Sequence, residues 1–354
     1  MQKRTQTHGA SCRLASAPSR ATLIRRTLAI VLVVVAVACA IPILRRAHTP
    51  PPVDDPAPAV TVRVLDVGQG DATYVHNGAS RVLIDGGPDP MRLGELLDSL
   101  GLDGSTLDAV ILSHAHADHY GGLAALFESR RHIRVRMFIE NGDGSPSPAL
   151  HALRDSVLAR TEHDGLDYRD GDDPCDNGTA TCTFTLAGGA RLEVLRPPDA
   201  EGAGVGANDR SVVVKLVAPD SAFSMWLAGD AEHGEIADAE RAGYARDPGM
   251  RVDVLKAEHH GSCNGITAHY LALTHPAWAL ISVGASNDYG HVHRQAKALF
   301  RTAGVPWYRT DQNGTITVRT SGVAGDPFTV TPSRGREDMD GPSDRQSRQV
   351  ECNG

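Results

Sequence analysis

Long apolar runs are scarce in this sequence: only one, Thr27–Leu44, extends over 18 residues. A run of this length can just cross a bilayer, so the chain cannot itself form a multi-helix membrane channel. Acidic residues are absent from the first 50 residues, which hold eight Lys and Arg. The remaining residues contain 27 basic and 43 acidic side chains, a net charge of −16. This excess of acid argues against broad nucleic-acid binding, which needs a basic surface, but it leaves room for a local basic groove.

The apolar run is flanked unevenly by basic residues, with six before it and only Arg45 and Arg46 directly after it. The positive-inside rule then places residues 1–26 in the cytoplasm as a basic tail and the rest of the chain outside. We therefore expect residues 27–44 to be a single transmembrane anchor in the cell membrane. The alternative is a signal segment that is cleaved before secretion, because Ala36–Ala38 offers a small-residue site.

Beyond the apolar run, the sequence divides into a linker, one large domain and a tail. Residues 45–59 are rich in proline and predict a stiff, extended spacer. Residues 60–331 alternate strand-like and helix-like segments and predict one α/β domain. Residues 332–354 are polar and charged, which predicts a disordered tail.

Within the domain, period-2 and short apolar runs predict strands, and apolar residues at helical spacing predict helices. The expected helices are 91–100, 148–161 and a segment that begins at Gly122. The expected strands are 60–67, 72–76, 81–84, 108–112, 182–186, 191–195, 212–217, 223–228, 251–256, 277–283 and 315–319. Two groups of strands separated by helices indicate two sheets packed face to face with helices outside.

Four potential metal ligands fall within six residues, at His114, His116, Asp118 and His119. The segment lies between an expected buried strand and an expected helix, so these side chains occupy a strand-to-helix turn. His114 and His116 alternate and can face one point, whereas Asp118 and His119 come round the turn and can face a second point. Imidazole and carboxylate suit zinc, manganese or iron, so the spacing predicts a site for two metal ions.

This motif, His-x-His-x-Asp-His after a buried strand, resembles that of the metallo-β-lactamase-fold hydrolases. Further motifs occur in the order seen in the C-terminal hydrolase domain of the ComEC competence family. They are Leu65–Ala72, Asp85–Gly87, Asn208–Ser211, Leu227–Asp230, Leu255–Ser262, Tyr289–His291 and Thr310–Gly314. The resemblance covers roughly residues 60–331 and implies a four-layer αββα sandwich with a dinuclear metal centre.

The resemblance extends the ligand set to later loops. Asp230 ends an apolar strand and is implied to bridge two ions, although a helix N-cap is also open to it. One residue of the pair His259 and His260 should complete the second metal site. Adjacent side chains on an extended segment point opposite ways, so the other faces the substrate, faces the first metal or is structural.

Four more polar residues fall in or near the family motifs. His291 is assigned a catalytic role, in which it stabilises a developing oxyanion or binds a phosphate. Asp209 stands where many enzymes of this fold carry a third histidine, so it is a further catalytic or metal-binding candidate. Asp66 and Asp85 are expected to orient the histidine ligands rather than to bind metal themselves.

Six cysteines allow one local disulfide. Cys175 and Cys182 lie seven residues apart in a polar insertion of the expected extracytoplasmic domain, so we expect them to be bonded to each other. Cys263, beside the histidine pair, and Cys352, in the tail, have no evident partner.

Together these features predict an exported, membrane-anchored hydrolase that uses two divalent ions, Zn or Mn, and a metal-activated water. The resemblance favours a phosphodiesterase, with a nuclease acting on DNA as its leading form. The alternatives are a hydrolase of another ester, such as a phosphocholine ester or a lactone, and a non-catalytic envelope-binding module. The sequence does not choose between these substrates or fix the oligomeric state.

Overall fold

The computed structural model describes residues 60–127, 131–142, 144–170, 181–195, 206–232, 249–285 and 287–335. The expected anchor at 27–44 and the linker at 45–59 lie outside this part of the chain. Within it, none of the helices combines the length and the apolar character needed to cross a bilayer.

The first sheet has eight strands in the order β17-β16-β1-β2-β3-β5-β7-β8. Neighbours from β17 to β3 are antiparallel, and neighbours from β3 to β8 are parallel. The strands are β1 (Val60–Val64), β2 (Thr73–Asn77), β3 (Ser80–Ile84), β5 (Ala109–Ile111), β7 (Met137–Ile139), β8 (Asp167–Arg169), β16 (Ile316–Thr320) and β17 (Thr329–Pro332).

The second sheet has seven strands in the order β15-β14-β13-β12-β11-β10-β9. Neighbours from β9 to β12 are antiparallel, and neighbours from β12 to β15 are parallel. The strands are β9 (Thr181–Thr185), β10 (Arg191–Leu195), β11 (Val213–Val217), β12 (Ser224–Leu227), β13 (Val254–Lys256), β14 (Trp278–Ile281) and β15 (Trp307–Arg309). Two short strands, β4 (Thr106–Leu107) and β6 (Arg134–Val135), form a separate parallel pair.

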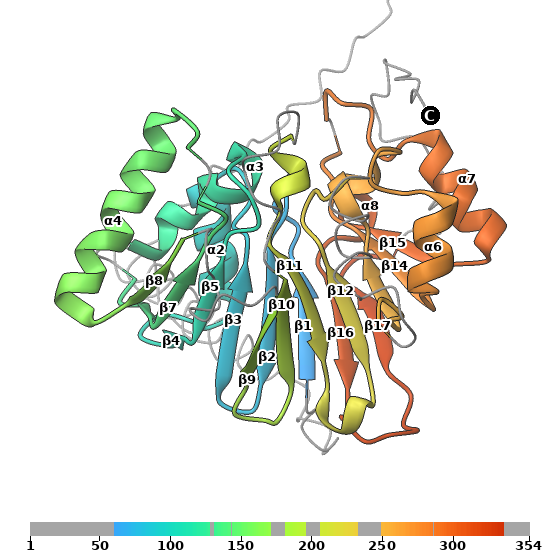
Figure 1. Cartoon of the computed structure of the whole chain (residues 1–354), viewed down its shortest axis with the longest axis horizontal. Helices are drawn as coiled ribbons and strands as arrows, with labels where there is room; N and C mark the ends of the chain where they lie inside the picture. Colours follow the sequence, from blue (N-terminus) through green and yellow to red (C-terminus); the bar gives the residue numbers. More distant parts are fainter. Residues whose placement is uncertain are drawn as a thin grey trace, which may run out of the picture. The chain divides into compact units, whose positions relative to one another are not determined.

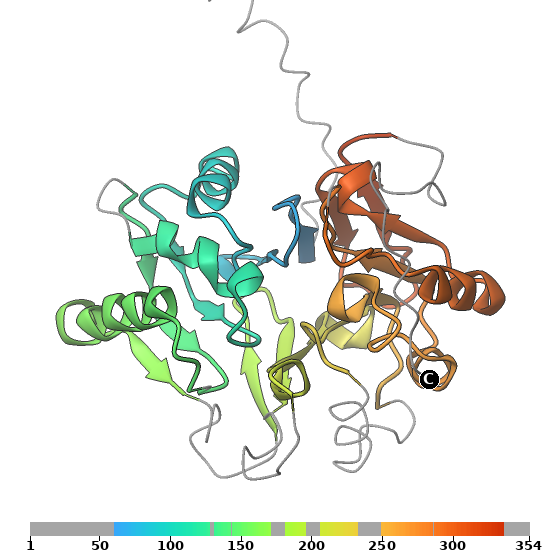
Figure 2. The same cartoon turned by 90° about the horizontal axis from the view of Figure 1, so that it is seen from above.

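Three apolar cores separate the layers. One lies between the sheets and joins residues such as Val62 and Val75 to Val214 and Leu216. The second packs α2 (Pro90–Ser99) and α4 (Pro148–Asp164) on the first sheet. The third packs α6 (Ala268–Thr274) and α7 (Arg294–Ala303) on the second. Figures 1 and 2 show these helices on the outer sides of the strands, so the predicted α/β class with two packed sheets is confirmed.

The ends of the two helices on the first sheet follow from local sequence. Asp89 caps α2 by accepting a hydrogen bond from the backbone N–H of Met91, and a proline occupies the first turn. Ser147 caps α4, which also begins with a proline and ends at Gly165 with φ of +68°. That left-handed conformation favours glycine and terminates the helix.

The structure differs from the sequence prediction after the metal motif. In place of one helix from Gly122, a short α3 (Ala117–Tyr120) runs into a 3-10 helix, η1 (Gly121–Phe127). The tight winding brings the backbone of Gly122 against the preceding loop. A Cβ there would lie 2.0 Å from the carbonyl oxygen of Gly86, so only glycine allows this approach.

A buried ion pair attaches α4 to the first sheet. Glu140, which follows β7, is fully buried and accepts hydrogen bonds from Arg154 Nε, at 2.8 Å to Oε1, and from the hydroxyl of Tyr168. Arg154 also donates to the second carboxylate oxygen of Glu140. We expect Arg154→Leu to lower the free energy of unfolding by about 3–5 kcal/mol, because it leaves a buried carboxylate without its cation.

A matched control exists on the same helix. Arg160 pairs with Asp164 at 2.6 Å, but both side chains are about one-third exposed. Arg160→Leu should therefore change the free energy of unfolding by no more than about 0.5 kcal/mol. Urea denaturation of both variants measures the difference, and equal effects would show that the buried pair contributes no more than the surface pair.

Candidate metal centre

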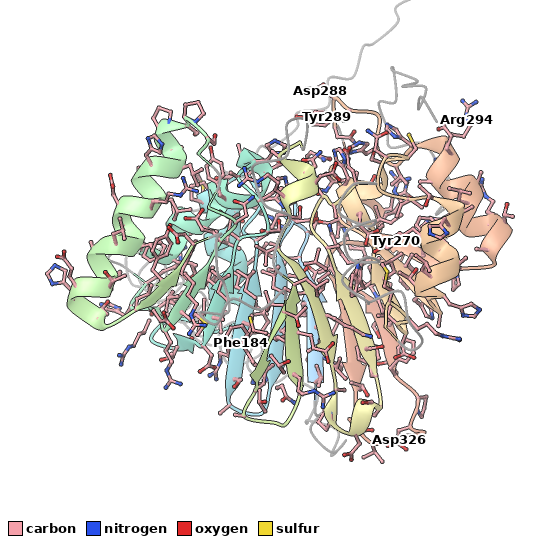
Figure 3. The ribbon with its side chains drawn as sticks, in the orientation of Figure 1. Phe184, Tyr270, Asp288, Tyr289, Arg294 and Asp326 are labelled. Carbon is pink, nitrogen blue, oxygen red and sulfur yellow. The ribbon has the colours of Figure 1, made fainter. Side chains whose placement is uncertain are left out.

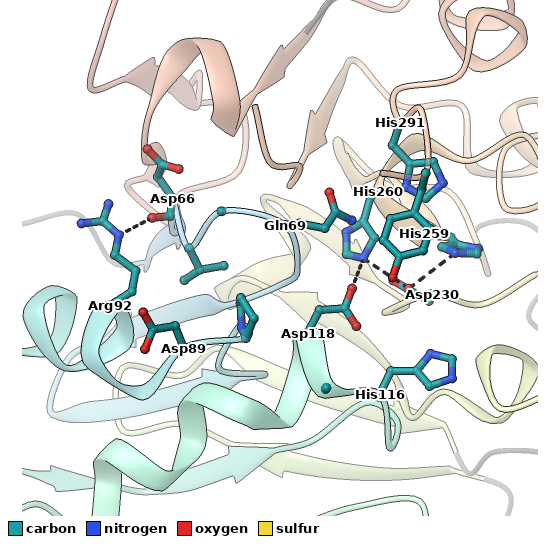
Figure 4. Close-up of a pocket in the computed structure, with 15 residues that line it drawn as sticks. Asp66, Gln69, Asp89, Arg92, His116, Asp118, Asp230, His259, His260 and His291 are labelled. Atoms are coloured by element: carbon teal, nitrogen blue, oxygen red, sulfur yellow. Dashed lines mark hydrogen bonds and ion pairs between the residues drawn. The ribbon is translucent and has the colours of Figure 1, made fainter. Parts of the chain in front are cut away.

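The predicted ligands lie at the ends of strands from both sheets. His114 to His119 follow β5 of the first sheet, Asp230 follows β12, and His259 and His260 follow β13 of the second. The sandwich brings these loops together at one edge, where Figure 4 shows them around a common pocket. Three segments that are distant in the sequence therefore build one site.

His114 and His116 converge on a first point. The Nε2 atom of His114 lies 3.0 Å from Nδ1 of His116 and 4.0 Å from Oδ2 of Asp230. His114 is buried, and its Nδ1 atom lies 3.1 Å from the hydroxyl of Ser113, which leaves Nε2 facing the site. His114, His119 and Asp230 offer ligand atoms within 4.8 Å of one another, and two imidazoles and one carboxylate so placed can hold a single divalent ion, with His116 beside them.

Asp118, His119 and His260 converge on a second point. Each offers a ligand atom within 4.8 Å of the others. His260 Nε2 lies 3.3 Å from Oδ2 of Asp118 and 3.3 Å from Oδ2 of Asp230, and His119 Nε2 lies 3.2 Å from Oδ1 of Asp230. The Asp230 carboxylate therefore lies between both groups of histidines, which is the position of a bridging ligand.

Unpaired buried atoms show that these residues fit a metal centre. The Nε2 atoms of His119 and His260 and Oδ1 of Asp230 are buried, and the only polar groups they face are one another's at ion-pair distance, without a well-aligned hydrogen bond in the described part of the chain. Leaving such atoms unpaired costs about 1–3 kcal/mol each. Their lone pairs point to the second group, and a bound cation would satisfy all of them. The donor set of imidazoles and carboxylates suits zinc or manganese.

Carboxylates and carbonyls behind the histidines set their orientation. Asp85 Oδ2 lies 2.9 Å from Nδ1 of His119, and the same carboxylate accepts hydrogen bonds from the backbone N–H and hydroxyl of Ser113. His260 Nδ1 lies 3.0 Å from the carbonyl oxygen of Ser282. A proton held on Nδ1 leaves Nε2 of each ring free for metal. Asp85 thus occupies the place expected from the sequence.

We expect Asp85→Asn to weaken metal binding by about 10- to 100-fold, since the amide nitrogen of asparagine cannot accept the hydrogen bonds that hold His119 and Ser113. Asparagine tolerates the φ of +58° at this position. Competition with a chromophoric chelator measures the affinity. Asp108→Asn, which changes a carboxylate that pairs with Arg136, is the control, and equal affinities in both variants would contradict the orienting role.

Asp66 does not occupy the orienting position expected from the sequence. Its carboxylate pairs with Arg334 at 2.7 Å, and its carbonyl oxygen accepts a hydrogen bond from Arg92. Asp71, which sequence reasoning missed, takes the inner position instead. It is buried, pairs with the buried Lys256, and lies 3.5 Å from His260 Nδ1. Spacing could not reveal this pair, because Lys256 is 185 residues away.

His259 lines the pocket near Asp230. Its Nε2 atom lies 3.9 Å from Oδ2 of Asp230, and its Nδ1 atom lies 2.8 Å from Glu232. Asp209 is not among the residues that line the pocket; it accepts a hydrogen bond from the backbone N–H of Glu232. The predicted catalytic role of Asp209 therefore gains no support from its position, whereas Glu232, which sequence reasoning missed, directly contacts His259.

The backbone is strained at the histidine pair. His259 has φ of +47° and His260 has φ of +54°, in the left-handed region. Non-glycine residues there cost about 1–3 kcal/mol each, and such strain concentrates at functional sites. The turn lets both side chains reach the same pocket, unlike the alternation expected of an extended segment.

The histidines and carboxylates of the site shift one another's pKa values. Burial lowers the pKa of His119 and of His260, but nearby carboxylates outweigh burial and raise both pKa values well above the usual range. For His119 these carboxylates are Asp230 and Asp85, and for His260 they are Asp230 and Asp71. Burial raises the pKa of Asp118, but His260 and His119 lower it to about 2. The metal-free centre therefore holds protons where the cations would lie.

A cavity of about 920 Å³ opens over the second metal group. Asp118, Asp230, His259, His260 and His291 line its inner end, and the outer end is lined by residues of the β1–β2 loop and the start of α2. Among the described residues that line it, Arg92 is the only lysine or arginine. The pocket is large enough for an extended substrate, but it offers little positive charge beyond the metal site.

Tyr289 lies at the rim of this cavity and contacts His291, which is buried. Burial and the charge of His260 lower the pKa of His291 to about 2, so its ring is neutral at pH 7. Tyr289 is 58% exposed and stacks on His291 with ring centroids 5.7 Å apart. Figure 3 shows Tyr289 at one edge of the sandwich, with Asp326 at the opposite edge. An open aromatic face therefore borders the metal centre.

The sequence of this chain is similar to those of known proteins. The metallo-beta-lactamase superfamily profile matches residues 65–176. ComE operon protein 3 of Bacillus subtilis is 30% identical over 78% of this chain and 35% of its own length. Recombination protein 2 of Haemophilus influenzae is 27% identical over 67% of this chain and 26% of its own length. The chain carries a metallo-β-lactamase superfamily domain related to the C-terminal region of these ComEC-type proteins.

The chain spans only about a quarter to a third of the length of these curated relatives. Among solved structures, the metallo-beta-lactamase fold protein YhfI from Bacillus subtilis aligns with a TM-score of 0.46 and 12% identity, over 73% of this chain and 99% of that one.

The cysteines fall partly outside the described residues. Cys182 and Cys263 are both disulfide-bonded, so Cys263 is not the unpartnered cysteine that the sequence indicated. Cys175 lies outside the described part, and its pairing with Cys182 stays a prediction.

Proposed function

We propose that the domain is a two-metal phosphodiesterase whose leading form is a nuclease. The observation that supports this function best is the Asp230 carboxylate, which lies 3.2–4.0 Å from His114, His119 and His260 beside an open cavity. Two-metal centres of this kind occur in phosphatases and nucleases. Two divalent ions, zinc or manganese, would bind the anionic oxygens of the substrate, activate a water as nucleophile and stabilise the charge that develops.

The residues of the chain have separate tasks in this scheme. His114, His116 and Asp230 would hold a first ion, and Asp118, His119 and His260, with Asp230, would hold a second. Asp85 and Asp71 keep the Nε2 atoms of their histidines directed at the ions. His291 is neutral and lines the cavity, so it can donate a hydrogen bond to substrate without adding charge.

Two features support a nucleic-acid substrate. One relative is named as a recombination protein, and another, of Neisseria gonorrhoeae, as a competence protein. In addition, Tyr289 is the only aromatic residue that is largely exposed in the described part of the chain, and it borders the cavity. Base stacking on an aromatic ring contributes about 1–3 kcal/mol per base and tolerates any base sequence.

The exposed face of Tyr289 also favours a second candidate, a phosphocholine ester. Asp66 and Asp89 line the outer end of the cavity, with Tyr289 also on its wall. A quaternary ammonium group is bound by aromatic faces. In this alternative the metal centre acts in the same way, and only the part of the substrate that lies at the rim of the cavity differs.

A substrate panel separates these candidates. The purified full-length chain, loaded with Mn²⁺ or Zn²⁺, is offered single-stranded DNA, RNA, bis-p-nitrophenyl phosphate, a phosphocholine ester and a lactone. We expect cleavage of bis-p-nitrophenyl phosphate and of DNA. Cleavage of the lactone alone would exclude the phosphodiesterase, and preference for the phosphocholine ester would replace the nuclease.

We also propose that the domain lies outside the cytoplasm, anchored by residues 27–44. The proposal rests on the distribution of basic residues around the apolar run. A compartment-sensitive reporter fused after Gly354 should give the signal of an exported protein. Peptide mapping without reduction should also find a Cys175–Cys182 disulfide. A cytoplasmic reporter signal would refute the topology.

A further inference from the structure

The loop between β1 and β2 is fixed against the metal-binding turn. The backbone N–H of Asp71 donates to the carbonyl oxygen of Asp118 at 3.1 Å, and the hydroxyl of Ser282 donates to the carbonyl oxygen of Gly70 at 2.7 Å. A Cβ on Gly70 would lie 2.1 Å from the same Asp118 oxygen. The loop therefore holds Gln69, which lines the cavity, in a defined place beside the second metal group.

The Gln69 side chain has one orientation in this environment. The backbone N–H of Gly284 donates to Oε1 of Gln69 at 3.1 Å. A backbone N–H can only donate, so this contact assigns Oε1 and directs the amide nitrogen, Nε2, the other way. Figure 4 shows the side chain on the His260 side of the pocket.

The Nε2 atom of Gln69 is buried and has no hydrogen-bond partner in the described part of the chain. An amide nitrogen carries two donors, and leaving a buried donor unpaired costs about 1–3 kcal/mol. The side chain belongs to the wall of the cavity, so a bound molecule can supply the missing acceptor. Because the amide has no net charge and does not titrate, it would donate equally well across the pH range.

We propose that Gln69 Nε2 donates a hydrogen bond to an anionic oxygen of the substrate beside the metal centre. In the phosphodiesterase proposed above, on which this assignment rests for its substrate class, the acceptor is a non-bridging oxygen of the scissile phosphate. A positioned donor of this kind stabilises charge that grows during attack, and removing one such donor typically costs about 10²- to 10³-fold in rate. Gln69 is thus a substrate-binding residue that uses hydrogen bonding where cations are scarce.

Two variants test the donor. Gln69→Glu keeps an oxygen for the N–H of Gly284 and replaces Nε2 by a second oxygen. Gln69→Met removes the donor without adding charge. Gln295→Met, at an exposed position of α7, is the control for the loss of a glutamine. Metal content and the midpoint of thermal unfolding are measured in each metal-loaded protein to detect structural damage.

The first readout is the affinity for inorganic phosphate, measured by calorimetry on the metal-loaded full-length chain, which does not depend on turnover. We expect Gln69→Met to bind phosphate about 10-fold or more weakly than wild type, as for loss of a hydrogen bond to a charged group. Gln69→Glu should bind more weakly still, and Gln295→Met should match wild type.

The second readout is kcat/KM on bis-p-nitrophenyl phosphate, for which we expect a loss of about 10²-fold in Gln69→Met. Wild type that fails to bind phosphate, or variants whose phosphate affinity and kcat/KM equal those of wild type, would overturn the role of Gln69. Weakened phosphate binding in the variants together with a wild type that cleaves no phosphodiester would instead overturn the proposed function and retain the anion-binding role.

Discussion

Asp118→Asn is expected to reduce hydrolysis by about 10³-fold or more while the fold is retained. Burial raises the pKa of Asp118, but His260 and His119 lower it to about 2, so the carboxylate is charged at neutral pH. Its Oδ2 atom lies 3.3 Å from Nε2 of His260. Asparagine keeps the shape of the side chain but removes the charge that helps to hold the second ion.

The measurement is kcat on the best substrate of the panel, with metal content determined in the same samples. Asp326→Asn is the control, because Asp326 lies at the opposite edge of the sandwich in Figure 3 and bonds to Ser321. The apolar core beneath the metal turn is unaltered, so the midpoint of thermal unfolding of the metal-free protein should change little. An Asp118→Asn protein that retained wild-type kcat would rule out a reaction that depends on the second ion.

Much of the sandwich could be predicted because its strands carry local signals. The strands that lead into the metal motifs are short apolar runs that end at polar residues, and β1, β2, β3, β5, β11, β12 and β13 occur within the predicted segments or one residue beyond them. The strands β7, β8 and β15 lie outside the predicted segments. Each has three residues, too few to show a period, whereas the equally short β5 and β13 lie inside longer predicted segments. Helix α7 was missed because one of its buried positions is Lys297, a residue type that is rarely buried.

In the candidate site, too, residues that are adjacent in the sequence could be predicted, and contacts between distant segments could not. The residues His114, His116, Asp118 and His119 stand together in the sequence, so their grouping was visible. The contacts of Asp71 with Lys256 and of Glu232 with His259 depend on how two sheets pack. Glu232 follows Asp230 by two residues, but no spacing rule links it to His259. Elements that meet only in the folded chain leave no local pattern.

Asp230→Asn is expected to affect both metal positions, because one carboxylate lies between both histidine groups. Asp230 is 3.2 Å from His119 Nε2, 3.3 Å from His260 Nε2 and 4.0 Å from His114 Nε2. Elemental analysis of the wild type should find close to two ions per chain, and the variant should hold less than one after the same dialysis. Asp220→Asn, in the exposed turn at the other end of β12, should retain the wild-type content.

The variant should also change the protons released when metal binds. In the metal-free protein the pKa values of His119 and His260 lie well above the usual range. Both rings are therefore positively charged at pH 7, with a proton on Nε2 as well as on Nδ1. A metal ion takes the Nε2 lone pair and displaces that proton, so metal affinity should rise with pH. Without the Asp230 charge both pKa values fall, and fewer protons are released. Calorimetry in two buffers with different ionisation enthalpies measures this number.

The same charges predict how the stability of the metal-free protein varies with pH. A histidine whose folded pKa is raised stabilises the fold fully below its unfolded pKa of about 6.5, and this stabilisation is lost as the pH rises through the folded value. Asp230→Asn should therefore lower the free energy of unfolding most at pH 6 and progressively less as the pH rises through the folded pKa values of His119 and His260. A pH-independent difference between the variant and wild type, together with unchanged metal content, would show that Asp230 neither bridges the ions nor pairs with these histidines.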